Sequence, residues 1–166
     1  MRKWISIITI LVVIVLISGC ASKSMPNTKN YSENGLSFTY PGNWSELDTT
    51  SYQSVLGDRG QLLVLVGDGS NSAFGVAKLN NEKNQTLENL VITYKLSLKS
   101  NGTEFISEGP ITIDAVKGHE ITVKASGNYF SSILFFKNNS SYLVGFESQN
   151  DDQQIFNQII KSLNVN

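Results

Sequence analysis

The sequence has 166 residues, a length that corresponds to one domain with a short extension. Thirteen basic and fourteen acidic residues give a net charge of −1, and without Arg2 and Lys3 the balance is eleven against fourteen, or −3. This charge excludes a basic nucleic-acid-binding domain. One cysteine and one histidine provide neither a disulfide framework nor a cluster of thiolate or imidazole ligands, so we expect no metal and no cofactor.

Residues 1–19 have the order of an export signal. Two basic residues precede an apolar run over residues 7–17, which is shorter than the roughly 20 residues that span a bilayer, and small residues come directly before Cys20. Residues 17–20 (ISGC) resemble the lipobox of prokaryotic lipoproteins, which implies that Cys20 becomes the lipidated first residue of the mature chain. The alternative is an uncleaved N-terminal anchor with an unmodified Cys20. Both alternatives place the domain outside the cytoplasmic membrane, on its outer surface.

Residues 20–32 are rich in Ser, Lys, Asn and Thr. With Ala21 and Met25 as the apolar groups, they offer too little burial to offset the entropy of becoming ordered. We therefore expect a flexible tether over residues 20–32, which joins a lipid anchor in the membrane to a folded domain over residues 33–166.

The folded domain begins with strand patterns. Residues 36–40 alternate between apolar and polar side chains and stop at a Pro-Gly turn, which predicts a first strand. Residues 61–67 contain an apolar run on both faces, which is typical of a central strand. Residues 73–79 follow a turn signal at residues 68–71, so we expect these two strands to form an antiparallel hairpin.

Two segments have helical periodicity. In residues 86–100 the apolar side chains recur at helical spacing, which predicts an amphipathic helix with Thr86 as its N-cap and Gly102 as its stop. Residues 151–163 carry a second apolar stripe, with two acidic residues at the start and Lys161 near the end, as the helix dipole favours. A stripe of this kind must dock on the sheet.

Between these helices the pattern is that of a β-meander. Turn signals such as Gly109-Pro110 and Lys117-Gly118 separate short strand candidates. The predicted strands cover residues 103–107, 111–115, 119–125, 129–137 and 141–148.

Three segments of the chain resemble the PsbP-like family: residues 34–44 (NGLSFTYPGNW), residues 111–122 (ITIDAVKGHEIT) and residues 160–163 (IKSL). That family includes a lumenal photosystem II subunit and many prokaryotic extracytoplasmic relatives, often lipoproteins. The resemblance spans about residues 31–166 and implies an α+β fold in which an antiparallel β-sheet is sandwiched by helices. The photosystem role does not follow from it, because no position here matches a residue with that task.

Two residues are candidates for contact with a ligand. Trp44 follows the turn after the first strand and could line a ligand slot, although such a residue more often covers a core. His119 invites a proton-transfer or metal role, but adjacent residues of a strand point to opposite faces, so His119 and Glu120 cannot chelate together. We expect His119 to be a solvated or turn-side histidine without an acidic residue to orient it.

Other polar motifs are explained by structure or by composition. Asp58, Asp68, Asp151 and Asp152 do not have the spacing of a calcium-binding loop, and turns or a helix N-terminus account for them. No serine lies in a G-x-S-x-G elbow, and no phosphate-binding glycine motif is present. Six asparagines begin N-x-[ST] sequences, which are glycosylation acceptors in an archaeal exported protein and Asn-rich surface loops in most bacteria.

The sequence therefore favours a non-catalytic, lipid-anchored module on the outer side of the membrane. Its expected partners are the membrane, through the lipid anchor, and either another envelope protein or a small ligand. The alternatives are a hydrolytic or other enzyme whose site is assembled from scattered residues, and a structural envelope protein.

Overall fold

The computed structural model describes residues 25, 27–81, 85–100 and 103–166. Cys20 and Gly102 lie outside these described residues, and so do the leader and most of the first part of the predicted tether. Among the described helices, none has the length and apolar character needed to cross a membrane.

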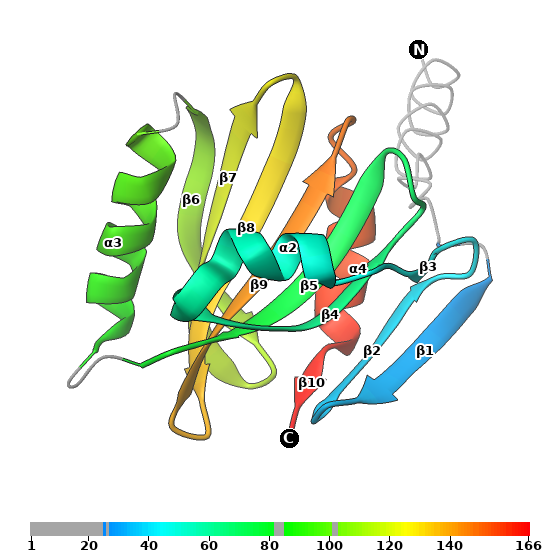
Figure 1. Ribbon diagram of the computed structural model, residues 1–166, viewed down its shortest axis with the longest axis horizontal. Helices are drawn as coiled ribbons and strands as arrows, with labels where there is room; N and C mark the ends of the chain where they lie inside the picture. The colour runs from blue at the N-terminus through cyan, green and yellow to red at the C-terminus, as the bar shows by residue number, and fades with distance from the viewer. Residues whose placement is uncertain (1–24, 26, 82–84, 101–102) are drawn as a thin grey trace, which may run out of the picture.

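Within the described part of the chain, the central element is a seven-stranded antiparallel sheet (Figure 1). Its spatial order is β3, β4, β5, β9, β8, β7, β6, so β6, β7, β8 and β9 each pair with the next strand in the chain and form the predicted meander. The turns β6–β7 and β8–β9 each contain two residues with positive φ, a geometry that fits the twist of a two-residue hairpin. The strands are β3 (Ser45–Glu46), β4 (Gly60–Gly67), β5 (Ser72–Leu79), β6 (Glu104–Ile113), β7 (Val116–Ala125), β8 (Asn128–Lys137) and β9 (Ser140–Ser148).

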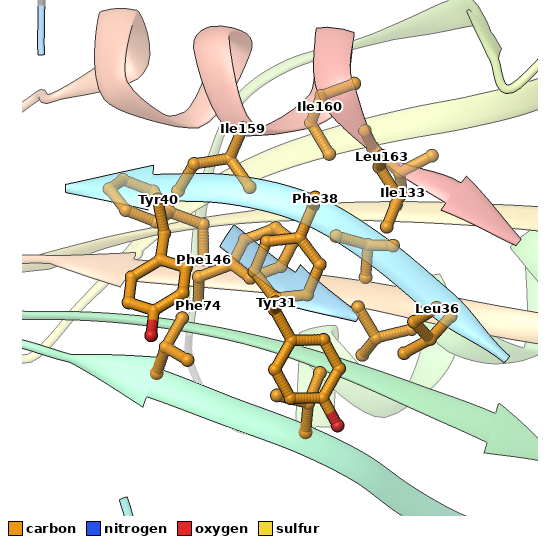
Figure 2. Packing of buried hydrophobic residues seen from close by; sticks show 14 of the residues in the cluster. Tyr31, Leu36, Phe38, Tyr40, Phe74, Ile133, Phe146, Ile159, Ile160 and Leu163 are labelled. Carbon is orange, nitrogen blue, oxygen red and sulfur yellow. The ribbon is translucent and has the colours of Figure 1, made fainter. Parts of the chain in front are cut away.

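One face of this sheet is covered by helix α4 (Gln153–Ser162) and by a small antiparallel sheet of β1 (Thr28–Glu33), β2 (Leu36–Pro41) and β10 (Asn164–Val165). The apolar stripe predicted for the closing helix faces this core, with Phe156 and Ile159 both fully buried. Figure 2 shows Ile159 and Ile160 directed toward β2 and the large sheet. The closing helix therefore docks on the sheet as expected.

The opposite face carries helices α3 (Leu87–Ser100) and α2 (Thr50–Leu56), which is followed by the short 3-10 turn η1 (Gly57–Arg59). Leu90 and Val91 of α3 pack against apolar side chains of β7 and β8 in a second core cluster. The hydroxyl Oγ1 of Thr86 accepts a hydrogen bond from the Asn89 amide at 3.2 Å, so the predicted N-cap is confirmed. The predicted α+β class, with helices on both faces of an antiparallel sheet, is also confirmed.

The predicted tether over residues 20–32 is wrong in its second half, because Thr28–Glu33 forms β1 and pairs along its whole length with β2. Tyr31 supplies the burial that the polar composition seemed to lack, since it is 5% exposed and stacks on Phe38 with 5.1 Å between ring centroids. Ahead of β1, the Met25 amide donates to Gln158 Oε1 on α4 at 3.1 Å. Met25, like β1, is therefore in contact with the folded domain.

The predicted strand boundaries near Pro110 are also wrong. A single strand, β6, runs through Gly109 and Pro110, and β7 already begins at Val116, so Gly118 lies inside a strand and not in a turn. Proline is tolerated here because β6 is the edge of the sheet, where an amide that faces away from β7 has no strand partner. The turn instead falls at residues 114–115.

The apolar run of β4 predicted a central strand. In the structure β4 lies instead next to the two-residue edge strand β3. It is covered on both faces for a different reason. Val64 and Val66 belong to the core beneath α4, whereas Leu62 and Leu65 face the side of α2 and α3. The predicted hairpin of β4 with β5 is confirmed.

Candidate functional site: a groove between two helices

A groove of about 540 Å³ opens on the large sheet between α2 and α3. It exists because α3 packs on β7 and β8 while α2 packs on β4, which leaves the strands between them without a covering helix. These uncovered strands, β5 and β9, pair directly through Gly75 and Gly145, with Ala73 and Ala77 on either side of Gly75. A Cβ at Gly145 would meet no other atom within 4 Å. The small residues thus form a hollow floor.

The walls of this hollow, which we call the α2–α3 groove, are mainly aliphatic. Leu56 comes from α2, Leu98 from α3, and the remaining apolar side chains come from the face of the sheet that bears no other cover. The apolar lining includes Leu56, Leu62, Leu65, Leu98, Val123, Phe130, Leu143 and Phe146. A concave, mostly apolar site of this volume lies within the usual range of small-molecule pockets, about 300–1,000 Å³.

Two hydroxyl groups meet in the interior of the groove. The Tyr94 hydroxyl and Ser132 Oγ are 2.7 Å apart and share one hydrogen bond, in which either hydroxyl can be the donor. Burial raises the pKa of Tyr94, an effect that the hydrogen bond with Ser132 partly opposes. The phenol is therefore neutral at physiological pH and supplies polarity without charge.

A single charged side chain, Glu147 on β9, occurs among the described residues that line the groove. Its Oε1 accepts a hydrogen bond from Asn128 Nδ2 at 2.7 Å, which holds the carboxylate at the end of the groove. Beyond it lies a second, more polar hollow of about 340 Å³, and the two hollows share Tyr52, Ala73 and Glu147. Asp48 is the other carboxylate of this polar hollow.

His119, which we expected to be a solvated or turn-side histidine, lies half-buried in the middle of β7, on the face that carries α3. Its Nε2 lies 3.6 Å from Glu108 Oε2, which is too long for a hydrogen bond, and Glu108 is bound at 2.6 Å by Lys95 Nζ of α3. The hydrogen bond and charge of Lys95 lower the pKa of Glu108. Glu120 points to the other face of the sheet, where Gln153 Nε2 donates to it at 2.8 Å.

We expected no acidic residue that orients His119; β6 brings Glu108 next to it, at a distance too long for a hydrogen bond. The predicted divergence of His119 and Glu120 is correct. None of the hydrogen bonds among the described residues joins His119 to a serine hydroxyl, and no group of three or more His, Cys, Asp or Glu side chains is placed there to hold a metal.

Trp44 lies in the hydrophobic core. It is 3% exposed and stacks on Phe146, with 6.3 Å between ring centroids and 15° between ring planes, so the packing interpretation is correct. Asp68 has the predicted turn role, since it accepts the amides of residues 70, 71 and 72. Partial burial acts to raise the pKa of Asp68, but these hydrogen bonds outweigh it and lower the pKa. The lipidation site Cys20 lies outside the described residues and stays a prediction.

The groove itself was missed by the sequence analysis. Alternate residues of a strand share a face, so the run of small side chains at Ala73, Gly75 and Ala77 is the signal that marks an under-filled surface. Its significance depends on Gly145, which is 70 residues further along the chain and pairs with Gly75 only in the folded sheet. The helices that form the walls are likewise placed by tertiary packing.

Neither a scan of known protein families nor a search of curated proteins finds a match for this chain. Among solved structures, it is similar to cyanobacterial PsbP (CyanoP) from Synechocystis, with a TM-score of 0.63 and 14% identity over 91% of this chain and 99% of that one. A protein from Bacteroides thetaiotaomicron has a TM-score of 0.51 and 16% identity, over 83% of this chain and 48% of that one. A third neighbour, LpqN from Mycobacterium tuberculosis, has a TM-score of 0.49 and 10% identity over 84% of this chain and 90% of that one.

At these identities the similarity concerns the fold alone. The resemblance seen in the sequence is confirmed at that level, because the CyanoP structure is matched over almost its whole length.

Proposed function

We propose that this protein with a PsbP-like fold is a lipid-anchored, extracytoplasmic binding module and not an enzyme. In this proposal the α2–α3 groove holds a small ligand or an apolar segment of an envelope partner. The observation that carries the proposal is the hollow floor at Gly145, where a Cβ would meet no other atom within 4 Å, because a sheet surface of this kind would normally be filled by larger side chains or covered by a helix.

A binding role fits the polar groups better than a catalytic one. General-base catalysis needs a base within hydrogen-bond reach of the proton that it removes. In this protein His119 has a carboxylate at 3.6 Å as its charged neighbour, and the Lys95 ammonium binds that carboxylate. In the groove, the neutral Tyr94 and Ser132 hydroxyls pair with each other and not with a base. Neither His119 with Glu108 nor Tyr94 with Ser132 forms a nucleophile activated by a base. Both pairs supply polar groups that a binding site can use.

The proposed anchor would keep the groove near the membrane. Lipidation at Cys20 leaves five residue steps before Met25, whose amide is bound to α4, and five steps extend over at most roughly 18 Å. A domain held in so thin a layer meets other membrane-bound molecules at a raised effective concentration, so weak contacts in the groove suffice for a stable association.

Three variants test this proposal in the native host. Cys20→Ser is expected to abolish labelling by fatty acid, and Gly145→Leu is expected to abolish function while the protein stays folded and anchored, because its side chain enters the open groove. His119→Ala, a change of similar size outside the groove, is expected to leave function intact. If His119→Ala alone removes function from a folded, anchored protein, the enzyme or metal-site alternative replaces the binding module.

A further inference from the structure

We propose that the α2–α3 groove and the polar hollow beside Glu147 together hold one amphiphilic ligand, with its aliphatic part in the groove and a cationic amine head next to Glu147. This inference rests on the proposed function and adds the chemical class of the ligand.

The two hollows are continuous where β5 and β9 pair. Ala73 and Glu147 are directly opposed in the strand register, and both of them line the groove of about 540 Å³ and the polar hollow of about 340 Å³. The small side chain of Ala73 leaves the passage open next to the long side chain of Glu147. A single elongated molecule can therefore extend from the aliphatic lining into the polar end.

The negative charge of the site favours a positively charged ligand. Glu147 and Asp48 are the charged side chains among the described residues that line the two hollows, and no Lys, Arg or His is among those residues. An anionic head such as a carboxylate would face like charge at the edge of an apolar surface, where attraction and repulsion are stronger than in water. A cation is attracted by the same field.

Glu147 also has hydrogen-bonding capacity left for a ligand. An ionised carboxylate offers about four acceptor positions, and the described contacts of Glu147 use Oε1 for the Asn128 amide. An ammonium group has three donors and no acceptor, so it complements such a carboxylate. In the groove, by contrast, the lining is mainly apolar and the Tyr94 and Ser132 hydroxyls are hydrogen-bonded to each other, which suits the apolar part of the molecule.

Three eight-carbon probes that differ only in the head group test the inference: octylammonium, 1-octanol and octanoate. Each probe is titrated by calorimetry against the full-length lipoprotein in lipid nanodiscs, with nanodiscs that carry the Gly145→Leu protein as the blank, so that partition into lipid cancels. At low ionic strength we expect octylammonium to bind at least about tenfold more tightly than octanoate, with a difference that narrows as salt screens the carboxylate.

Glu147→Gln keeps the acceptor for Asn128 and removes the charge. It is expected to lower the affinity for octylammonium to that for octanol and to leave octanol unchanged. Glu104→Gln, which makes the same change in net charge on the exposed edge strand β6, is expected to alter neither affinity.

The outcomes separate the two proposals. If octanol binds to the native protein and not to Gly145→Leu, while octanoate binds as tightly as octylammonium or Glu147→Gln keeps the preference for the amine, the cationic head is rejected and the binding groove stands. If none of the probes distinguishes native from Gly145→Leu nanodiscs, both the head group and the groove as a binding site are rejected.

Discussion

Gly145 and Gly118 allow the same substitution, glycine to alanine inside a strand, to be made in two opposite environments. A Cβ at Gly145 would point into the groove and meet nothing within 4 Å, whereas a Cβ at Gly118 would lie 3.0 Å from the Leu134 carbonyl oxygen and 3.3 Å from carbons of the two neighbouring side chains. Neither glycine has a positive φ, so backbone strain does not enter the comparison.

The expected magnitudes have opposite signs. Gly145→Ala lowers the entropy of the unfolded chain at a site that accepts an L-residue, which stabilises the fold by about 0.4–1 kcal/mol. Gly118→Ala forces a methyl group into contacts that are already filled, which costs about 1–3 kcal/mol. For a domain of this size each kcal/mol shifts Tm by roughly 2–4 °C. The two variants should therefore differ in Tm by about 3–16 °C, with the native protein between them.

Thermal unfolding followed by circular dichroism, with urea titration as a second measure, tests this pair. The groove is genuinely open only if Gly145→Ala matches or exceeds the stability of the native protein. A loss at Gly145 as large as the loss at Gly118 would refute the reasoning, because it would mean that another part of the chain fills the space above the floor.

Two further predictions concern the face of the sheet that carries α4. Phe156 is fully buried, and its ring centroid is 5.4 Å from that of Phe146, so Phe156→Ala should destabilise the domain by about 3–5 kcal/mol in urea titrations; a loss below 1 kcal/mol would contradict the packing of α4. Burial raises the pKa of Glu120, although the hydrogen bond from Gln153 opposes this, so the ionised form opposes folding and stability falls as pH rises through the folded-state pKa. Glu120→Gln should therefore raise Tm at pH 7, with a gain that shrinks as pH falls through the raised folded-state pKa and is lost near about 4.3, the ordinary pKa of glutamate; a gain that is constant with pH would exclude the charge as its cause.

The elements that the sequence predicted well are those whose signal is local. The apolar stripe of residues 151–163 and the cap at Thr86 reflect helical periodicity and a hydrogen bond within one turn, and both have the expected place in the structure. The strands 36–40 and 73–79 were found for the same reason, since alternation and a turn signal are both properties of neighbouring residues.

The errors arose where a distant segment decides the outcome. Residues 28–33 are polar enough to suggest a tether, and they are ordered because β2 offers a pairing edge and Tyr31 a place to stack. Pro110 suggested a chain reversal, and it is accommodated because β6 is at the edge of the sheet. The short helix α2 has no acidic residue in its first turn and no side-chain cap, so its sequence contains little helical signal.

The candidate site was the least predictable part of the molecule. Trp44 and His119 were candidates for ligand contact because of their residue types. In the structure Trp44 is in the core and His119 lies outside the groove. The groove depends on the absence of a side chain at Gly75 and at Gly145. These two glycines meet only through strand pairing. Small residues at alternate positions of one strand indicate a groove only when the facing residues of the neighbouring strand are known.

The most direct test of the binding groove is to identify what the native protein carries when it is purified from its own membranes. Organic extracts of the native, Gly145→Leu and His119→Ala proteins, purified in parallel, would be compared by mass spectrometry. We expect an apolar compound that is enriched with the native and His119→Ala proteins and depleted with Gly145→Leu. Identical extracts from the native and Gly145→Leu proteins would contradict the assignment of the groove as the binding site.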